Sequence, residues 1–369
     1  MRRLAVCLAL APAIFGYDSA FAGPPEALIA AAQKEGALTL IGYNRDWCGF
    51  GATIDDFKQK FGLVVNELAP SSNGGEQLEA LRANKENTGP QAPDVIEVGA
   101  AFGEVARQEG LLLPYKASLW DELPTATKDP EGYWYGDTIG VMAFEINADI
   151  VKTLPQDWSD LLAPEYANMV ALASDPRTSN MALLAIYAAG LSVSGDKTAK
   201  AAEAGIAFFT ELNKRGNFVT ANGNAANLAQ GTTPIAIRWD FLARAEKAAL
   251  DGNPHVEVVI PKSGIIAGMN VYAVSAHAPH PNAGKLWVEH LSSDDGQLNF
   301  IRHGCHPVRY DDLLKRGVIR QICLPSFRRM RFRTPSCRRS KSWRPRRRSS
   351  WRAGPASSAP SECCRRGGA

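Results

Sequence analysis

The chain has 369 residues, with 41 Lys and Arg against 38 Asp and Glu, and a formal net charge of +3. This length is sufficient for two domains with separate cores. Beyond residue 22 no stretch has the roughly 20 consecutive apolar residues that a bilayer span requires, which excludes a membrane-embedded protein. The charge is unevenly distributed: residues 23–319 hold 24 basic and 36 acidic residues, and residues 320–369 hold 15 basic residues and one acid.

The N-terminus has the pattern of a Sec-type signal peptide. Arg2 and Arg3 precede an apolar run over residues 4–15, and Ala20-Phe21-Ala22 offers the small residues of a cleavage site. The alternative, a membrane anchor, requires a longer apolar run. We therefore predict that residues 1–22 are removed and that the mature protein is soluble and lies outside the cytoplasm.

The mature chain begins with alternating helices and strands. A helix is predicted over residues 24–35, because prolines occupy its first turn and Gly36 lies just beyond its end. Apolar runs and helical patterns then alternate, which predicts strands at 37–43, 63–68 and 94–99, and helices at 54–61, 74–83 and 101–110. This alternation favours a parallel sheet with helices on both faces.

The middle of the chain repeats the pattern as a second α/β unit. It predicts strands at 168–173, 233–239 and 256–261, and helices at 179–190, over 201–212 and from about 241. Two extended apolar runs, 137–146 and 268–276, lie between the units, and we interpret them as strands that cross between two lobes. Residues 281–301 predict two amphipathic helices that belong with the first lobe.

These patterns predict an α/β fold with two lobes, each built on a parallel-core sheet with helices on both faces. Lobe one would comprise residues 23–140 and 270–319, and lobe two residues 141–269. The two crossing strands would act as hinges. In open α/β sheets ligands bind beside the carboxyl ends of the strands, so the loops at these ends are the candidate site.

The C-terminal segment, residues 320–369, has a different character. It is rich in Arg with Ser, Pro, Trp and four of the seven cysteines, and it has no helical or strand period. We interpret it as a disordered segment from a gene read out of frame from about Arg320. The alternative is a basic tail that binds nucleic acid or an anionic membrane.

Two cysteines remain once both ends are set aside. They are Cys48 and Cys305, in a protein expected in an oxidising compartment. We predict a disulfide between them, which would tie the last ordered segment to the first; two separate thiols are the alternative. Cys305 and His306 are neighbours in an extended segment, where side chains point in opposite directions, so they do not form a nucleophilic pair. Too few ligands are present for zinc.

Polar and aromatic side chains follow several predicted strands at ends that would face one crevice. The candidate ligand-binding residues are Asn44, Asp46 and Trp47, then Ser71, Ser72 and Asn73, then Arg177, Thr178 and Ser179 in the loop DPRTSN, then Arg238, Trp239 and Asp240, and finally Asn270 and Tyr272 on the returning strand. No catalytic residue, metal ligand or cofactor site is predicted.

The residue types suggest roles for some candidates. Free N–H groups at the helix starts after Ser72 and Ser179 suit an anion, although helix capping is the alternative role of these polar residues. The Trp239 indole suits a cation or an alkyl chain. Asp240 contacts the ligand or caps the following helix, and Arg238 is an anion clamp or the ion-pair partner of an acid such as Asp46.

Three segments resemble the extracellular solute-binding proteins of ABC importers. They are PQDWSDLLAPEYANMVALASDPRTSN at 155–180, IRWDF followed by VVIPKSG up to residue 264, and APHPNAGKLWVEHLSSDDGQ at 278–297. The likeness is greatest to the subgroup of polyamine, ferric-iron and phosphonate binders. It implies a two-lobed type II periplasmic-binding-protein fold in the periplasm, which closes on a small solute and delivers it to permease subunits in the inner membrane.

The resemblance leaves the ligand open. Gly268 and Asn270 stand where polyamine binders of this family usually have an aromatic residue and an acid, and the chain has no Tyr-Tyr pair of the kind that ligates ferric iron. We expect a small organic amine or zwitterion, with an oxyanion such as a phosphonate, or chelated ferric iron, as alternatives. A secreted α/β hydrolase is the alternative from another class, but no nucleophile or acid–base motif supports it. We expect a monomer that does not bind nucleic acid.

Overall fold

The computed structural model describes residues 23–195 and 199–321, which belong to one compact unit. The predicted signal peptide and residues 322–369 of the predicted basic tail lie outside the described residues. Among the helices of the described part, none has the length and apolar character to span a membrane.

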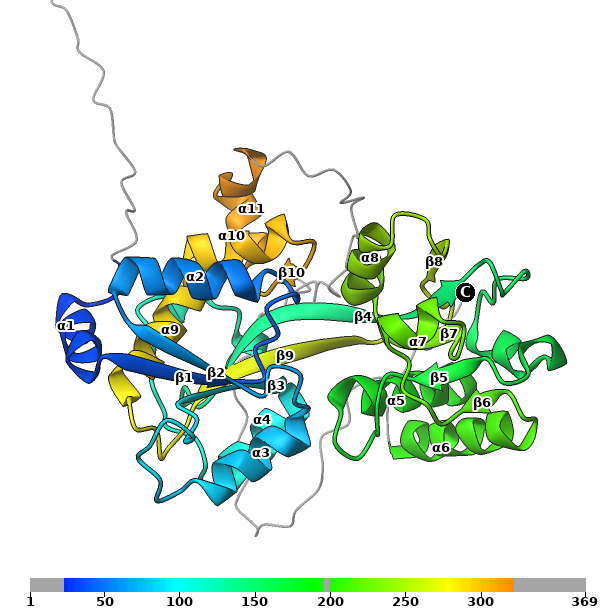
Figure 1. Cartoon of the computed structure of the whole chain (residues 1–369), viewed down its shortest axis with the longest axis horizontal. Coiled ribbons are helices and arrows are strands. Elements are labelled where there is room, and N and C mark those ends of the chain that lie inside the picture. Colours follow the sequence, from blue (N-terminus) through cyan, green and yellow to red (C-terminus); the bar gives the residue numbers. More distant parts are fainter. Residues whose placement is uncertain (1–22, 196–198, 322–369) are drawn as a thin grey trace, which may run out of the picture. The chain divides into compact units, whose positions relative to one another are not determined.

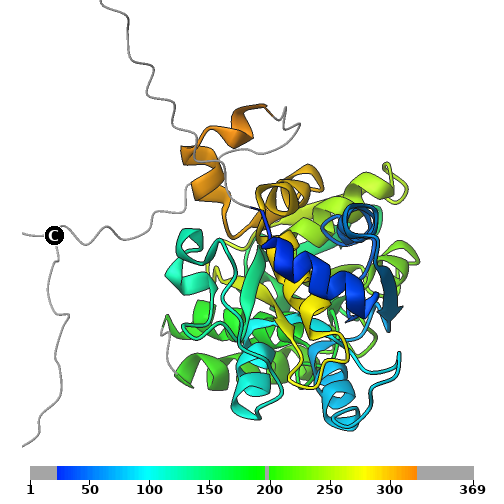
Figure 2. The same cartoon turned by 90° about the vertical axis from the view of Figure 1, so that its left-hand side faces the viewer.

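Lobe one, as we call the part built on the first three strands, alternates helices and strands as expected. Its elements are α1 (Glu26–Glu35), β1 (Ala37–Ile41), α2 (Phe50–Phe61), β2 (Val64–Leu68), α3 (Gly74–Ala83), β3 (Val95–Gly99) and α4 (Ala100–Gln108). Strand β1 pairs in parallel with both β2 and β3. Figure 2 faces this lobe and shows helices on both sides of its strands.

Lobe two, the part built on β5, β6 and β7, has the same organisation. Its elements are β5 (Val170–Leu172), α5 (Asn180–Ser194), α6 (Ala199–Lys214), β6 (Phe218–Val219), α7 (Ala225–Ala229), β7 (Ile235–Trp239), α8 (Asp240–Ala249) and β8 (Val256–Val259). Strand β5 pairs in parallel with β6 and β7. Helices α5 and α6 approach closely at Gly190, where a Cβ atom would lie 1.7 Å from the carbonyl oxygen of Ala201.

The predicted crossing strands are β4 (Tyr135–Asn147) and β9 (Ala267–Val274) (Figure 1). Hydrogen bonding runs unbroken through the order β2-β1-β3-β9-β4-β7-β5-β6. It is unbroken because β4 is 13 residues long and changes partners: it pairs with β9 up to Val141 and with β7 from Met142 onwards. The strands of the two lobes are therefore hydrogen-bonded to one another through β4. The exact lobe boundaries at 140/141 and 269/270 remain a prediction.

The C-terminal helices pack on lobe one, where α9 (Pro281–Ser292) contacts α1 and β1, and α10 (Asp294–Arg302) contacts α2. An aromatic cluster fills this contact. The Tyr43 ring is 5.0 Å from Phe50 and 5.5 Å from Trp287, and Phe50 is 5.7 Å from Phe300, all edge to face. Such contacts add to the free energy gained by burying the rings.

The predicted disulfide between Cys48 and Cys305 is confirmed. It joins the loop before α2 to the segment between α10 and β10 (His306–Pro307), across 257 residues of sequence. The bond therefore fastens the end of the described chain to the lobe in which the chain begins.

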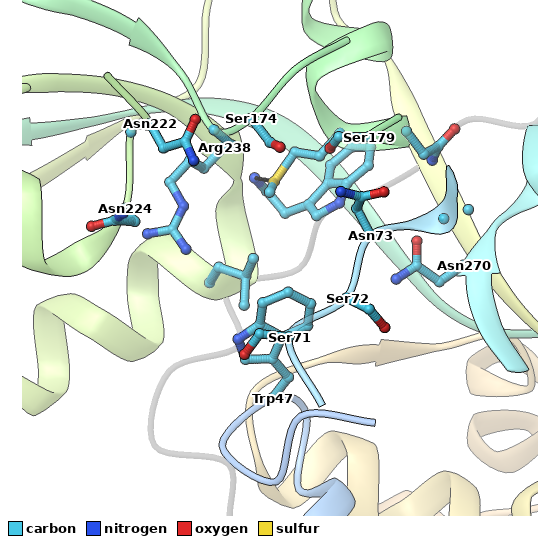
Figure 3. A pocket seen from close by; sticks show the side chains of 18 of the residues that line it. Trp47, Ser71, Ser72, Asn73, Ser174, Ser179, Asn222, Asn224, Arg238 and Asn270 are labelled. Carbon is cyan, nitrogen blue, oxygen red and sulfur yellow. Dashed lines mark hydrogen bonds between the residues drawn. The ribbon is translucent and has the colours of Figure 1, made fainter. Parts of the chain in front are cut away.

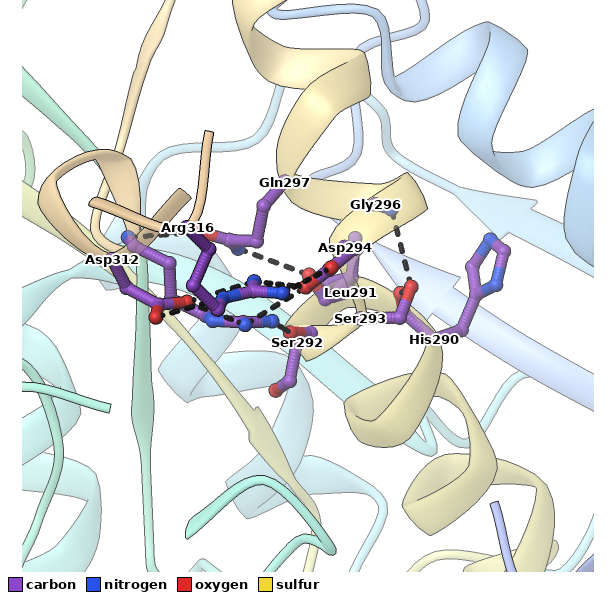
Figure 4. Close-up of polar contacts among 10 residues, drawn as sticks. His290, Leu291, Ser292, Ser293, Asp294, Gly296, Gln297, Asp312 and Arg316 are labelled. Atoms are coloured by element: carbon purple, nitrogen blue, oxygen red, sulfur yellow. Dashed lines mark hydrogen bonds and ion pairs between the residues drawn. The ribbon is translucent and has the colours of Figure 1, made fainter. Parts of the chain in front are cut away.

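Buried Arg309 connects the last helices through a polar network. Figure 4 shows Asp294, Asp312 and Arg316, which belong to this network. The Arg309 guanidinium donates to the carbonyl oxygen of Ser292 at 2.5 Å and pairs with Asp294 at 2.8 Å and Asp312 at 2.7 Å. Asp312 belongs to α11 (Tyr310–Lys315), and Arg316 pairs with the same two carboxylates. One guanidinium thus holds the ends of α9, α10 and α11 together.

Replacing Arg309 with Met should lower the free energy of unfolding by about 2–4 kcal/mol, because a buried ion pair loses one partner while Asp294 and Asp312 stay near each other. Urea denaturation of the purified protein measures this loss. Arg302→Met, on the exposed side of α10, is the control and should cost less than about 0.5 kcal/mol. Equal losses in the two variants would contradict the proposed role of Arg309.

Candidate ligand-binding site

A cavity of about 580 Å³ opens where the loops of the two lobes meet. Its volume lies in the range of small-molecule sites. Residues of lobe one and β9 that line it are Trp47, Ser71, Ser72, Asn73, Gly74, Glu76, Gln77, Glu97, Val98, Gly99 and Asn270. Those of lobe two are Ala173, Ser174, Ser179, Asn180, Met181, Asn222, Gly223, Asn224, Ala225, Ala226, Arg238, Trp239, Phe241, Leu242 and Glu246 (Figure 3).

The start of α3 forms one wall of the cavity. Asn73 caps the helix: its side chain accepts a hydrogen bond from the N–H of Glu76, and the Glu76 carboxylate accepts one from the N–H of Asn73. Gln77 holds the preceding loop to β3 by donating to the carbonyl oxygens of Ser72, at 3.2 Å, and Glu97, at 2.6 Å. The Ser72 hydroxyl is buried and has no hydrogen-bond partner among the described residues.

The start of α5 forms the facing wall. The Ser179 hydroxyl caps this helix by accepting from the N–H of Ala182. The Asn180 side chain lies so close to β3 that a Cβ atom at Gly99 would sit 2.1 Å from its Cγ, and its amide nitrogen has no partner within the described ranges. The N–H of Gly75 donates to the carbonyl oxygen of Thr178 at 3.1 Å. The two helix starts are therefore in direct contact across the lobes.

Arg238, at the end of β7, shares one charge between two carboxylates. Its Nη1 atom lies 2.9 Å from Glu145 on β4 and also contacts Glu246 on α8. Burial lowers the pKa of the guanidinium, but Glu246 and Glu145 outweigh this effect and raise it. Burial raises the pKa of the Glu145 carboxyl to about 8, with Arg238 opposing the shift and Glu246 adding to it. Because one guanidinium cannot balance two buried anions, the more buried Glu145 retains its proton at neutral pH.

Trp239 connects the cavity to the crossing strands. It is buried, and its ring covers backbone of both strands: a Cβ atom at Gly268 on β9 would lie 2.1 Å from the indole, and one at Gly140 on β4 would lie 3.1 Å from it. Gly268 therefore makes room for Trp239. Next to it, Asp240 accepts a hydrogen bond from the N–H of Val141 at 2.9 Å, at the residue where β4 changes partners.

Eight of the fourteen predicted ligand-binding residues line the cavity. They are Trp47, Ser71, Ser72, Asn73, Ser179, Arg238, Trp239 and Asn270. The capping alternative also holds for Asn73 and Ser179, and the acids that pair with Arg238 are Glu145 and Glu246 rather than Asp46.

The other six predicted residues lie outside the lining of this cavity. Tyr272 is fully buried, stacked on Tyr135 and bonded to Ser292. The Arg177 side chain is 86% exposed and pairs with Asp175. The side chain of Asn44 donates to Ser71, and Asp46 is exposed. The carbonyl oxygen of Thr178 accepts from the N–H of Gly75, and Asp240 accepts from the backbone of β4.

Several lining residues were missed by the sequence analysis. Ser174 lies two residues beyond the end of β5, so the rule that ligands bind at strand ends would have found it. Asn222 and Asn224 lie in TANGNAAN between β6 and α7, and β6 is too short to show a strand period. Glu97 lies within β3 and Glu246 within α8, so neither has a loop signal that could have identified it.

Comparison with known proteins places this architecture in a family. A profile described as "Bacterial extracellular solute-binding protein" matches residues 91–320. The chain belongs to this family. The solute-binding protein is 26% identical over 293 residues to the "Probable ABC transporter periplasmic-binding protein y4fP" of Sinorhizobium fredii, with 78% of this chain and 79% of the relative covered.

Two further matches agree with this assignment. The "Putative 2-aminoethylphosphonate-binding periplasmic protein" of Salmonella typhimurium is 24% identical over 306 residues, which cover 79% of this chain and 80% of the relative. The solved structure of the periplasmic binding protein AfuA from Actinobacillus pleuropneumoniae has a TM-score of 0.63 and 23% identity, with 74% of this chain and 85% of that chain covered. The fold is the two-lobed type II periplasmic-binding-protein fold, as the resemblance implied.

The solute-binding protein is thus the periplasmic component of an ABC transporter that captures a small solute for the permease. The relatives that define this role are transport proteins rather than enzymes.

The proton on Glu145 makes stability depend on pH. The folded protein keeps this proton up to about pH 8, whereas an unfolded chain loses it near pH 4.5, so the free energy of unfolding should fall as pH rises from about 5 to about 8. Glu145→Gln should reduce that fall by about 3 kcal/mol, measured by urea denaturation across this pH range. Glu203→Gln, on the exposed side of α6, is the control. An unchanged slope in Glu145→Gln would show that Glu145 is ionised throughout.

Proposed function

We propose that the solute is a small zwitterion with an oxyanion at one end and an amine at the other, of the aminoalkylphosphonate type. One observation carries this proposal: two buried side-chain donors beside helix starts, the Ser72 hydroxyl and the Asn180 amide, line the same cavity as an excess of carboxyl groups.

The anionic end of such a solute suits the walls formed by α3 and α5. Helix N-termini offer free N–H groups and a partial positive charge to an anion. The Ser72 hydroxyl and the Asn180 amide add two buried donor groups whose hydrogen-bonding capacity is unused by the described residues. Groups of this kind are costly to bury unless a ligand completes their hydrogen bonds.

The cationic end suits the charge of the cavity. Its charged lining residues are Glu76, Glu97, Glu246 and Arg238, three acids against one base, and Arg238 is already paired. The indoles of Trp47 and Trp239 also line the cavity and suit the face of an ammonium group or its methylene chain. The relative from Salmonella typhimurium carries in its name a solute with this combination of groups, which supports the proposal.

Other features of the protein's biology belong to the same proposal. Residues 1–22 would direct export, and the mature protein would act as a monomer, bind no nucleic acid and release its solute chemically unchanged. Lobes with boundaries at 140/141 and 269/270 would move about β4 and β9 when the solute enters or leaves.

Isothermal titration of the full chain with 2-aminoethylphosphonate, ethylphosphonate, putrescine and ferric citrate tests the proposal. We expect 2-aminoethylphosphonate to bind most tightly. Ser72→Ala should weaken its binding roughly tenfold or more, because a hydrogen bond to a charged group is lost. Ser194→Ala, at the exposed end of α5, should bind like the wild type. Tightest binding of putrescine or ferric citrate would refute the proposal.

A further inference from the structure

Glu97 is a buried residue at the cavity, and one oxygen of its carboxyl group has no hydrogen-bond partner among the described residues. It lies on β3, is 4% exposed and lines the cavity. Gln77 fixes its backbone on both sides, accepting from its N–H at 3.0 Å and donating to its carbonyl oxygen at 2.6 Å. The side-chain atom Oε1 is buried and has no hydrogen-bond partner in the described part of the chain. A carboxylate in this position requires a partner that the fold itself does not supply.

The groups that surround Glu97 are acidic or neutral. In addition to burial, the charge of Asp137 on β4 raises the pKa of the Glu97 carboxyl, and the Asn270 amide on β9 lowers it. The phenol of Tyr43, beyond β1, adjoins both carboxyls, and the phenol of Tyr272 on β9 adjoins Asp137. Helix α3 contributes the neutral Gln77. The groups that these contacts place around the pair therefore include no cation.

Burial and mutual repulsion act against full ionisation of the two carboxyls. Burial raises the pKa of Glu97 well above its ordinary value, and the charge of Asp137 adds to the rise. Burial also raises the pKa of Asp137, to about 6, with hydrogen bonds from Thr138 opposing the shift. Both shifts act against a second negative charge on the pair, because adjacent buried carboxyls do not readily ionise together.

We propose that Glu97, backed by Asp137, is the subsite for the ammonium group of the solute, and that this group replaces the proton shared by the two carboxyls. The ammonium donates to the Glu97 carboxylate in place of that proton, and its positive charge lets both carboxyls ionise. The displaced proton leaves to solvent, so one proton is released for each solute bound. This inference rests on the proposed function, because it assigns the amine end of the same zwitterion.

The position of Glu97 also limits the length of the solute. Glu97 and Gly99 lie on the same face of β3, about 7 Å apart along the strand. Gly99 is where α4 begins and where the Asn180 side chain approaches β3. The ammonium subsite therefore lies close to the start of α5. This spacing suits a solute whose amine and oxyanion are joined by two or three carbons rather than a long polyamine.

Proton release is measured by titrating 2-aminoethylphosphonate into the wild-type protein at pH 7 in buffers that differ in ionisation enthalpy. We expect close to one proton released and a dissociation constant that falls as pH rises from 6 to 8. Glu97→Gln should release none and bind 2-aminoethylphosphonate at least tenfold more weakly, with its affinity for ethylphosphonate unchanged. Glu79→Gln, exposed on α3, is the matched control.

The outcomes separate this inference from the proposed function. If the wild type binds 2-aminoethylphosphonate but releases no proton, or if Glu97→Gln binds it as the wild type does, the subsite is wrong and the proposed function stands. If the wild type binds neither phosphonate, both are wrong. The wild-type measurement does not depend on the folding of any variant, and thermal melting of Glu97→Gln shows whether its loss of affinity reflects unfolding.

Discussion

The structure depends on one strand that serves two sheets. Strand β4 is hydrogen-bonded to β9 and β10 along its first part and to β7 and β8 along its second. The change of partners at Val141 and Met142 coincides with the contact from Asp240 and with the ring of Trp239 over Gly140. The connection between the lobes and the cavity between them are therefore built from the same residues. A ligand that touches Trp239 acts directly on the strands about which the lobes would turn.

Buried carboxyls are the second common element of the site. Glu97 lines the cavity, Asp137 and Glu145 are buried on β4, and Glu145 pairs with Arg238. Burial disfavours the charge on each of them, which makes the empty protein less stable than an apolar core of the same shape would be. Groups of this kind are concentrated at binding sites, where a ligand can satisfy them. Under the proposed function, this cost of burial would add to the affinity for a ligand that carries a positive charge.

Much of this architecture follows from sequence patterns, and the failures have physical causes. Alternating apolar runs predicted β1, β2, β3, β5 and β7, and long apolar runs predicted the two crossing strands. Asn270 and Tyr272 share a face of β9, yet only Asn270 reaches the cavity. At the position of Tyr272, two residues further along, β9 is enclosed between β3 and β4. Arg177 pairs with Asp175 in its own loop, and no strand period predicts which way a loop side chain turns. Glu97 was missed because a single acid within a buried strand has no pattern until its partners on β4 and β9 are known.

The disulfide has a consequence for how the molecule is made. Cys48 emerges early during translocation, and its partner follows 257 residues later. The first thiol must therefore stay unpaired, or exchange an early wrong pairing, until nearly all of the described chain has crossed the membrane. The covalent closure of lobe one can therefore form only after residue 305 has been translocated.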